Sequence, residues 1–487
     1  MVTVIVNLSR YLILILMLLY TLQCFSVFGR KTDEAKRNVM RKQIVSMLFM
    51  DFVAFLVMYL QTEDVWMAYG CAAVMGYIIA VQVLYRIFYP KASLLLVNNM
   101  CMLLSIGFII LARLDMDQAR KQYLIAVAGT LVSLAVPVII RKVRSLKNLT
   151  WLYAVAGIGM LGVVLVLATV SRGAKLSIEI GGVTFQLSEV VKITFVFFIA
   201  GILRTDTSFK NVVIATVVSA AHVLILVASR DLGSALVFFV AYLVMIYVAT
   251  KKLRYAAAGL AGGCVAAVGA YYLFSHVRQR VITWKDPFAV YNEVGGGYQV
   301  AQSLFAVGAG GWFGMGLFEG TPEKIPIAEK DFVFAAICEE LGGLFCICML
   351  LVCMSCFLMI INISMRMNNR FYKLIALGLG AEYAFQVFLT VGGSINFIPL
   401  TGITLPLVAY GGSSVIATIL VFAIIQGLYI LREDEGEQIE KQKHKKDKPK
   451  KPGKPGRGNR RKEEREEYVE KTLEEKIREQ TEKSLNW

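Results

Sequence analysis

Runs of apolar residues of membrane-spanning length repeat along this 487-residue chain. Crossing the hydrocarbon core of a bilayer takes about 20 residues, and only helices and closed barrels satisfy their backbone there. The runs are continuous, whereas barrel strands alternate apolar and polar residues, so helices are favoured. With 57% hydrophobic residues, the sequence predicts an all-α, polytopic membrane bundle of about 13 transmembrane helices. The expected spans are residues 9–28, 43–60, 65–86, 95–112, 122–140, 150–170, 188–203, 212–228, 233–250, 254–274, 332–361, 372–392 and 411–431.

Lysine and arginine gather in alternate connections, as they do on the cytoplasmic side of membrane proteins. The opposite connections 61–64 and 392–411 hold neither residue, although 113–121 breaks the trend with three basic residues. This pattern predicts an outside N-terminus, a cytoplasmic C-terminus and an extracytoplasmic loop 275–331. The net charge of +16 is then a topology signal, and no nucleic-acid partner is expected.

We expect three regions along the chain. Residues 1–92 form a three-helix N-terminal extension, and 93–431 form a ten-helix membrane core that contains the loop 275–331. Residues 432–487 form a basic, partly disordered tail. Its lysine-, proline- and glycine-rich stretch 441–462 cannot bury a core. It is either a solvated topology anchor or a patch that binds anionic membrane lipid.

The loop 275–331 is the long segment before the tail that is not a continuous apolar run. Long loops in compact proteins are usually functional or disordered, and this one carries too little charge for disorder. It ends in Asp331, which is followed at once by Phe-Val-Phe. From the residues alone, Asp331 is either a helix N-cap or a catalytic acid.

Ionisable residues inside membrane spans are functional candidates by default. Glu189 and Lys192 are three residues apart, so they share a helix face, either as a structural ion pair or as part of a site. Asp231 precedes a span and is expected to cap it. Arg172 and Lys175 are either interface anchors or ligands for an anionic head group. With three histidines and nine cysteines, all cysteines in apolar segments, neither a histidine metal site nor a disulfide framework is expected.

The segment before the last span cannot continue a helix, because it contains Pro399 and Pro406. Irregular backbone at membrane depth is tolerated where it is buried in protein or lines a wet cavity. Gly411, Gly412 and Ser413 then present N–H groups and a hydroxyl at a helix start, where anions bind.

Several motifs occur in a fixed order, and in that order they resemble the SEDS family of FtsW, RodA and SpoVE type proteins. They are Gln-x-Ser-Glu-x-x-Lys at 186–192, Asp-Leu-Gly-Ser at 231–234, Gly-Tyr-Gln-x-x-Gln-Ser at 297–303, Asp-Phe-x-Phe at 331–334 with Glu-Glu-Leu-Gly at 339–342, Pro-Leu-Thr-Gly-x-x-Leu-Pro at 399–406 and Tyr-Gly-Gly-Ser-Ser at 410–414.

The resemblance implies a peptidoglycan glycosyltransferase of the bacterial cell membrane. Such enzymes polymerise lipid II by inverting transfer from an undecaprenyl-pyrophosphate sugar and work with a class B penicillin-binding protein. It implies that Asp331 is catalytic, that Glu189 and Lys192 are a paired acid and base, and that Gln302 and Ser303 support the site. We expect Glu339 and Glu340 to lie further along the helix that follows Asp331 and to hold helices together.

The chain also departs from the family pattern. Leu187 and Arg230 stand where the family usually has proline, and Lys175-Leu-Ser replaces a usual Arg-Trp. The three N-terminal helices have no counterpart in that pattern, and the sequence assigns them no function.

The chemistry adds two requirements. Departure of the pyrophosphate needs cationic stabilisation, from Lys192, Arg172 or Lys175, with or without a divalent ion such as Mg²⁺ or Mn²⁺. The acceptor hydroxyl needs a base. The alternatives are a flippase of lipid-linked sugars, which predicts midplane charges and an inverted repeat, and a non-catalytic scaffold for a penicillin-binding protein. The sequence does not distinguish elongation, division and sporulation.

Overall fold

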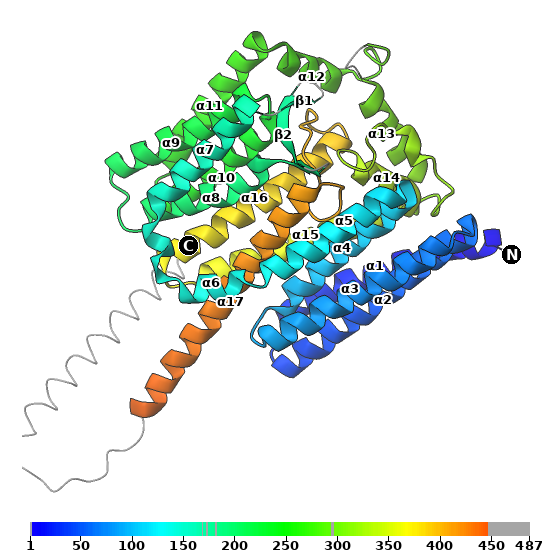
Figure 1. Ribbon diagram of the computed structural model, residues 1–487, viewed down its shortest axis with the longest axis horizontal. Coiled ribbons are helices and arrows are strands. Elements are labelled where there is room, and N and C mark those ends of the chain that lie inside the picture. The colour runs from blue at the N-terminus through cyan, green and yellow to red at the C-terminus, as the bar shows by residue number, and fades with distance from the viewer. Residues whose placement is uncertain (1, 168, 172–173, 181–182, 294–296, 447–487) are drawn as a thin grey trace, which may run out of the picture. The chain divides into compact units, whose positions relative to one another are not determined.

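The computed structural model describes residues 2–167, 169–171, 174–180, 183–293 and 297–446. They form a bundle of long helices with one small antiparallel sheet (Figure 1). The chain divides into two units, Met1–Asp434 and Glu435–Trp487. The helices from α1 to α16 and the sheet all belong to the first unit.

The elements follow in chain order. The first part contains α1 (Val2–Gly29), α2 (Asp33–Thr62), α3 (Val65–Phe88), α4 (Leu94–Leu114), α5 (Met116–Ser133), α6 (Val136–Lys142), the 3₁₀ helix η1 (Arg144–Asn148) and α7 (Thr150–Leu167). The middle part contains β1 (Thr169–Ser171), β2 (Ala174–Ile180), β3 (Val183–Phe185), α8 (Leu187–Leu203), α9 (Phe209–Ala228), α10 (Leu232–Thr250) and α11 (Leu253–Leu273). The last part contains α12 (Ser275–Lys285), α13 (Tyr298–Gly310), the 3₁₀ helix η2 (Pro322–Lys324), α14 (Val333–Leu341), α15 (Gly343–Arg366), α16 (Arg370–Ser394) and α17 (Gly412–Lys446).

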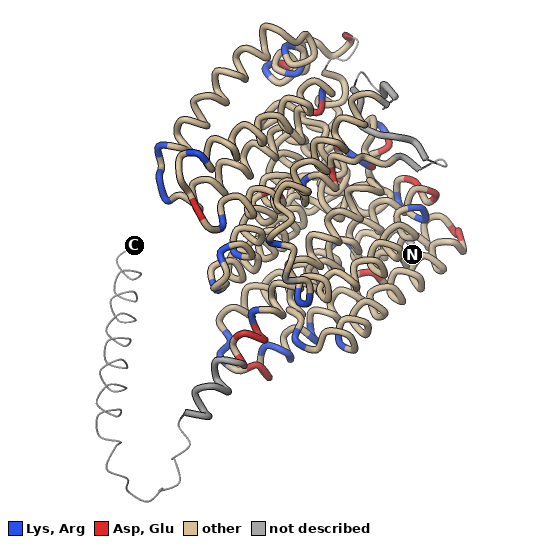
Figure 2. Tube along the Cα trace, turned by 60° about the vertical axis from the view of Figure 1, so that its left-hand side comes forward, with Lys and Arg blue, Asp and Glu red and all other residues tan. Residues whose placement is uncertain are grey.

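The described helices confirm the predicted polytopic bundle. Eleven of them are long and apolar enough to cross a membrane. The shorter apolar helix α7 and the 17-residue α8 take the two remaining predicted positions. Charged residues lie mostly near the helix ends (Figure 2). The protein is therefore a multi-pass membrane protein.

One predicted span was wrong. Residues 332–361 do not form a single helix, because Gly342 separates α14 from α15 with a φ of +91°. A Cβ added to Gly342 would lie 2.4 Å from the backbone nitrogen of Gly314, so the break needs glycine for both its conformation and its close approach. The apolar run continues through the break, which is why hydrophobicity alone did not reveal it.

Three other boundaries also differ from the prediction. The span predicted at 122–140 divides into α5 and α6, with Pro137 in the first turn of α6. The span predicted at 150–170 ends at Leu167 and is followed by the strand order β1-β2-β3, in which Thr169 pairs with Ser177 and Ile178 with Phe185. The loop 275–331 contains α12, α13 and η2.

The N-terminal extension α1–α3 packs on the rest of the bundle through α4 and α15. α4 is almost completely buried and contacts α2, α3, α5 and α15, and α1 contacts both α2 and α15. A polar network crosses this junction: the Asn98 amide donates to Gln43 at 2.8 Å and accepts from Gln82 at 2.8 Å, while Asn99 accepts from Tyr20 and donates to Ser355. Interhelical hydrogen bonds in membranes contribute about 0.6 kcal/mol each. Their directionality fixes the position of the extension.

The irregular segment between α16 and α17 enters the bundle beside α4. A Cβ added to Gly107 of α4 would lie 2.7 Å from the carbonyl oxygen of Val408, so this approach is open to glycine alone. Pro406 is buried and Pro399 is half-buried in this segment. Buried irregular backbone is the arrangement that membrane depth permits.

Candidate functional site

The candidate site gathers at the end of the bundle where α12, α13, α14 and the sheet lie (Figure 1). Asp331 is half-buried in the turn before α14. Phe332 is the N-cap residue of α14, so Asp331 does not take the N-cap position that its place in the sequence also allowed. Its main-chain oxygen accepts a hydrogen bond from the Ser394 hydroxyl at 3.0 Å. Ser303 in turn donates to the carbonyl oxygen of Ser394 at 2.6 Å.

Ser303 therefore supports Asp331 from behind. Its side chain is fully buried on α13, and its partner Ser394 ends α16. Two helices distant in sequence thus fix the backbone of the Asp331 turn. The adjacent Gln302 donates to the Tyr291 hydroxyl at 2.9 Å and so braces the loop.

Arg280 on α12 is the cation beside Asp331. It donates to the carbonyl oxygen of Thr401 at 3.2 Å. A Cβ added to Gly402, which has a φ of +75°, would lie 4.0 Å from both the Arg280 Nη2 and the Asp331 Oδ2. Burial lowers the pKa of the Arg280 guanidinium, while Asp231 and Asp331 oppose that shift. Sequence reasoning missed Arg280, because nothing local separates it from the other basic residues of the loop.

Asp231 joins this region to the start of α8. It caps α10, the role that its sequence context predicted, by accepting from the Ser234 amide at 3.0 Å. Its second carboxylate oxygen accepts from the Ser188 hydroxyl at 3.2 Å and from the side-chain amide of Gln186 at 3.3 Å. Burial raises the pKa of Asp231, the nearby Glu189 raises it further, and the cap hydrogen bond opposes both.

Glu189 and Lys192 form the ion pair that their spacing allowed, with a separation of 2.8 Å, and both are buried. Lys192 also donates to the Gln386 side chain at 2.7 Å, and Gln386 donates to the Thr404 carbonyl oxygen at 3.0 Å. Both the carboxylate and the amide that hold Lys192 are internal to the protein. Lys192 is therefore a poor candidate for the cation that meets a leaving group.

A third carboxylate shares this cluster. Glu382 is fully enclosed on α16 and lines a cavity of about 20 Å³ with Glu189 and Lys192. Its Oε1 has no hydrogen-bond partner, and the cavity is large enough for one water. Sequence reasoning missed Glu382 and Gln386, although intramembrane ionisable residues were the signal in use.

Glu339 and Glu340 hold elements together, as predicted. Arg113 at the end of α4 donates to Glu340 at 2.7 Å, and Glu339 accepts from the Thr321 amide at 2.9 Å. Both lie further along the helix that follows Asp331, as expected, because α14 covers Val333–Leu341. Through these contacts they bind the loop 275–331 and α4 to α14.

The remaining predicted groups are placed as follows. The main-chain amide of Gly411 donates to the Gln122 side chain at 3.0 Å. The Ser413 hydroxyl accepts from the main-chain amide of Gln186 at 3.1 Å, so both groups already have partners inside the protein. Gly412 begins α17. Lys175 lies in β2, and Arg172 lies outside the described residues.

The metal hypothesis can be tested against the donors present. No group of three potential ligand side chains occurs in the described ranges. Mg²⁺, however, is commonly held by one or two carboxylates together with substrate phosphates. Asp331 fits that second arrangement, in which the substrate supplies most of the ligands.

Comparison with known proteins decides the family. The family model described as "Cell cycle protein", which covers FtsW, RodA and SpoVE, matches residues 89–433. The chain belongs to the FtsW/RodA/SpoVE family. It is 33% identical over 371 residues to the peptidoglycan glycosyltransferase RodA of Mycobacterium bovis, covering 70% of this chain and 78% of that protein. It is 34% identical over 305 residues to the probable peptidoglycan glycosyltransferase FtsW of Aliivibrio salmonicida, covering 58% of this chain and 74% of that protein.

Solved structures share the fold of this FtsW/RodA/SpoVE member. A chain from a peptidoglycan synthase complex, studied for the coordination of polymerization and crosslinking, superposes with a TM-score of 0.61 at 23% identity. It is covered over 98% of its length by 70% of this chain. The Rod shape determining protein RodA of Thermus thermophilus superposes with a TM-score of 0.54 at 21% identity, covering 69% of this chain and 96% of that one. The family match begins at residue 89, so α1–α3 precede it.

The structure explains how this family member departs from the proline pattern. Arg230 has a φ of +63°, which proline cannot adopt, so the turn before Asp231 has a different backbone from one that contains proline. Leu187 is the first residue of α8, a position where proline is well tolerated. Arg230 therefore changes the backbone relative to proline, whereas Leu187 does not.

Proposed function

We propose that this protein is a peptidoglycan glycosyltransferase that polymerises lipid II at the outer face of the bacterial cell membrane. Its RodA relative is named a peptidoglycan glycosyltransferase, and its FtsW relative a probable one. The observation that carries the proposal is the placement of Asp331 beside Arg280 at the rim of the bundle, in a turn held by Ser394 and the buried Ser303.

Each step of the transfer has a residue suited to it. Asp331 is half-buried, so its carboxylate can reach an acceptor hydroxyl and take its proton as the sugar bond forms. Arg280 stabilises the negative charge that develops on the departing pyrophosphate, because a fixed cation in a dry site interacts strongly with developing charge. Glu189 and Lys192 hold α8 to α16 and so support the site from within the membrane. A bound divalent cation would neutralise pyrophosphate charge, and Asp331 would then hold the cation in place of acting as the base.

The partner and orientation belong to the same proposal. The relative found in a peptidoglycan synthase complex supports a class B penicillin-binding protein as partner. The segregation of lysine and arginine supports a cytoplasmic C-terminus and an outside site. Residues 447–487 lie outside the described ranges, so binding of the tail to anionic lipid stays a prediction.

The test is polymerisation of lipid II by purified protein in nanodiscs, with and without candidate partners. We expect Asp331→Asn to lose about 10²–10⁴-fold in rate, the usual contribution of a general base. Asp286→Asn is the matched control: Asp286 is an exposed aspartate of the same loop that caps a turn through the amides of Phe288 and Ala289, and Asn caps as well as Asp does. Full polymerisation by a well-folded Asp331→Asn protein would instead favour the scaffold function.

A further inference from the structure

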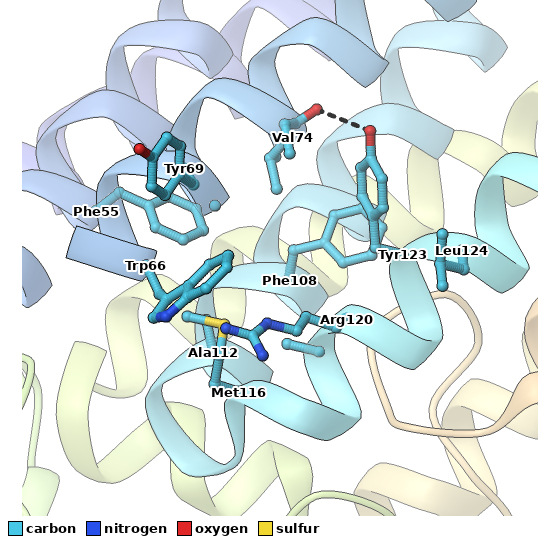
Figure 3. Close-up of a pocket in the computed structure, with 13 residues that line it drawn as sticks. Phe55, Trp66, Tyr69, Val74, Phe108, Ala112, Met116, Arg120, Tyr123 and Leu124 are labelled. Carbon is cyan, nitrogen blue, oxygen red and sulfur yellow. Dashed lines mark hydrogen bonds between the residues drawn. The ribbon is translucent and has the colours of Figure 1, made fainter. Parts of the chain in front are cut away.

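A groove runs between α3 of the extension and α5 of the core (Figure 3). α3 packs closely on α2 and α4 but touches α5 at few points, so the two helices stand apart. Phe55 of α2 and Phe108 of α4 form its floor. The cavity has a volume of about 330 Å³, which is within the ~300–1,000 Å³ typical of small-molecule sites.

The groove is closed at one end and open at the other. At the closed end the Tyr123 hydroxyl donates to the Ala73 carbonyl oxygen, and Tyr77 hydrogen-bonds Thr130 at 2.8 Å. At the open end Trp66 is 55% exposed. From Trp66 to the wall residue Val74 the groove is about 12 Å long, at 1.5 Å of rise per residue.

These dimensions select the occupant. The groove's length of about 12 Å suits a single hydrocarbon chain that lies between α3 and α5. Its lining is almost wholly apolar and includes the exposed Tyr69 and Leu124, so this face meets lipid in a membrane.

The rim adds a head-group site. The Arg120 guanidinium lies 4.3 Å from the centre of the Trp66 ring and 3.4 Å from Asp117. Arg120 is 45% exposed, so its remaining donors can reach a phosphate at the mouth of the groove. The connections at this end carry four acidic residues against three basic ones, Glu63, Asp64, Asp115 and Asp117 against Arg113, Arg120 and Lys121, and Arg113 is already paired with Glu340. That balance favours a head group with both a phosphate and an ammonium over one with a net negative charge.

We infer that this groove binds one zwitterionic, amine-bearing glycerophospholipid. One acyl chain fills the space between α3 and α5, the phosphate contacts Arg120, and the ammonium meets the acidic rim. The arrangement lies at the same end of the bundle as the loop 275–331, because Arg113 at the end of α4 binds Glu340. The lipid would lie between α3 of the extension and α5 of the core.

The test uses the full chain in nanodiscs that contain equal amounts of phosphatidylethanolamine and phosphatidylglycerol. Native mass spectrometry counts the lipids retained after release. We expect one retained phosphatidylethanolamine per chain. Arg120→Gln removes the cation and Ala73→Leu fills the groove, and each is expected to reduce retention about tenfold or more, as loss of one charge-assisted contact does. Arg86→Gln, at the other end of α3, and Ala80→Leu are exposed positions outside the lining, and as matched controls they should retain the lipid.

Three results would overturn the inference. Equal retention by wild type and Arg120→Gln would remove the phosphate contact, and this exposed substitution is not expected to disturb folding. Preferential retention of phosphatidylglycerol would contradict the rim charge argument. The third result comes from nanodiscs that also contain undecaprenyl phosphate. Preferential retention of that isoprenyl lipid would identify the groove as a substrate-lipid site.

Discussion

The contact between Arg113 and Glu340 predicts how firmly the loop that carries Asp331 is held to the bundle. The Arg113 Nε lies 2.7 Å from the Glu340 Oε1, and the two side chains are 10% and 0% exposed. The guanidinium also stacks 4.2 Å above the Phe318 ring and donates to the Gly320 carbonyl oxygen at 3.3 Å. Arg113→Met keeps much of the side-chain volume but leaves the Glu340 carboxylate buried without its cation.

Removing one partner of a buried ion pair costs about 3–5 kcal/mol. At 1.4 kcal/mol per tenfold change, the opening equilibrium of the loop should rise by about two to three and a half orders of magnitude. Hydrogen exchange measures this opening at three amides that bond to α14. The amides of Met315 and Gly316 donate to the carbonyl oxygens of Glu339 and Glu340 at 2.9 Å, and that of Thr321 donates to the Glu339 carboxylate.

Two further variants test whether the Arg113–Glu340 pair holds the loop. Arg113→Met with Glu340→Met should recover most of the lost protection, because replacing both members of a buried pair is often neutral or stabilising. Arg120→Met should leave these amides unchanged, since its partner Asp117 is 80% exposed and such a pair contributes about 0–1 kcal/mol. Unchanged exchange in Arg113→Met, or a double variant no better than the single one, would show that the pair does not hold the loop.

Three further predictions follow from particular contacts. Leu187→Pro should leave thermal stability in detergent unchanged, because proline suits the first position of a helix. Arg230→Pro should destabilise the protein by about 3 kcal/mol or more, because proline cannot take a φ of +63°. Equal stability of the two variants would contradict the turn described here. Glu382→Gln should be tolerated, since its Oε1 has no partner, while Lys192→Met should cost about 3–5 kcal/mol of unfolding free energy by leaving buried carboxylates without a cation; the reverse order would refute this account of the cluster. A cysteine at the exposed Lys324, in a variant without native cysteines, should react with an impermeant thiol reagent on whole cells, and labelling only after the cells are opened would invert the topology.

Local patterns in the sequence were sufficient where one helix supplies the whole feature. The spans follow from runs of hydrophobic residues, and the Glu189–Lys192 pair follows from a spacing of three on one helix. The cap at Asp231 likewise depends on the helix start beside it. These parts of the fold and site could be predicted because their partners lie within a few residues.

Features that need a distant partner could not be predicted. The Arg113–Glu340 pair joins residues 227 positions apart, and Arg113 counted in the sequence only as an exception to the charge pattern. Gly342 breaks a helix inside an unbroken apolar run because Gly314 approaches it from another segment. Tertiary packing determines both features, and the hydrophobicity of the sequence does not predict that packing.

The packing also changes which cation we propose for the reaction. Lys192 looked suited to a leaving pyrophosphate because of its charge and its place at a span end. In the folded protein its ammonium is held by Glu189 at 2.8 Å and by Gln386 at 2.7 Å, and moving it to a substrate would leave a buried carboxylate uncompensated. Arg280 is only partly buried, it donates to the neutral carbonyl oxygen of Thr401, and it lies beside Asp331, the proposed base. We therefore propose that the stabilising charge comes from Arg280 on α12, in the same loop that ends in the proposed base.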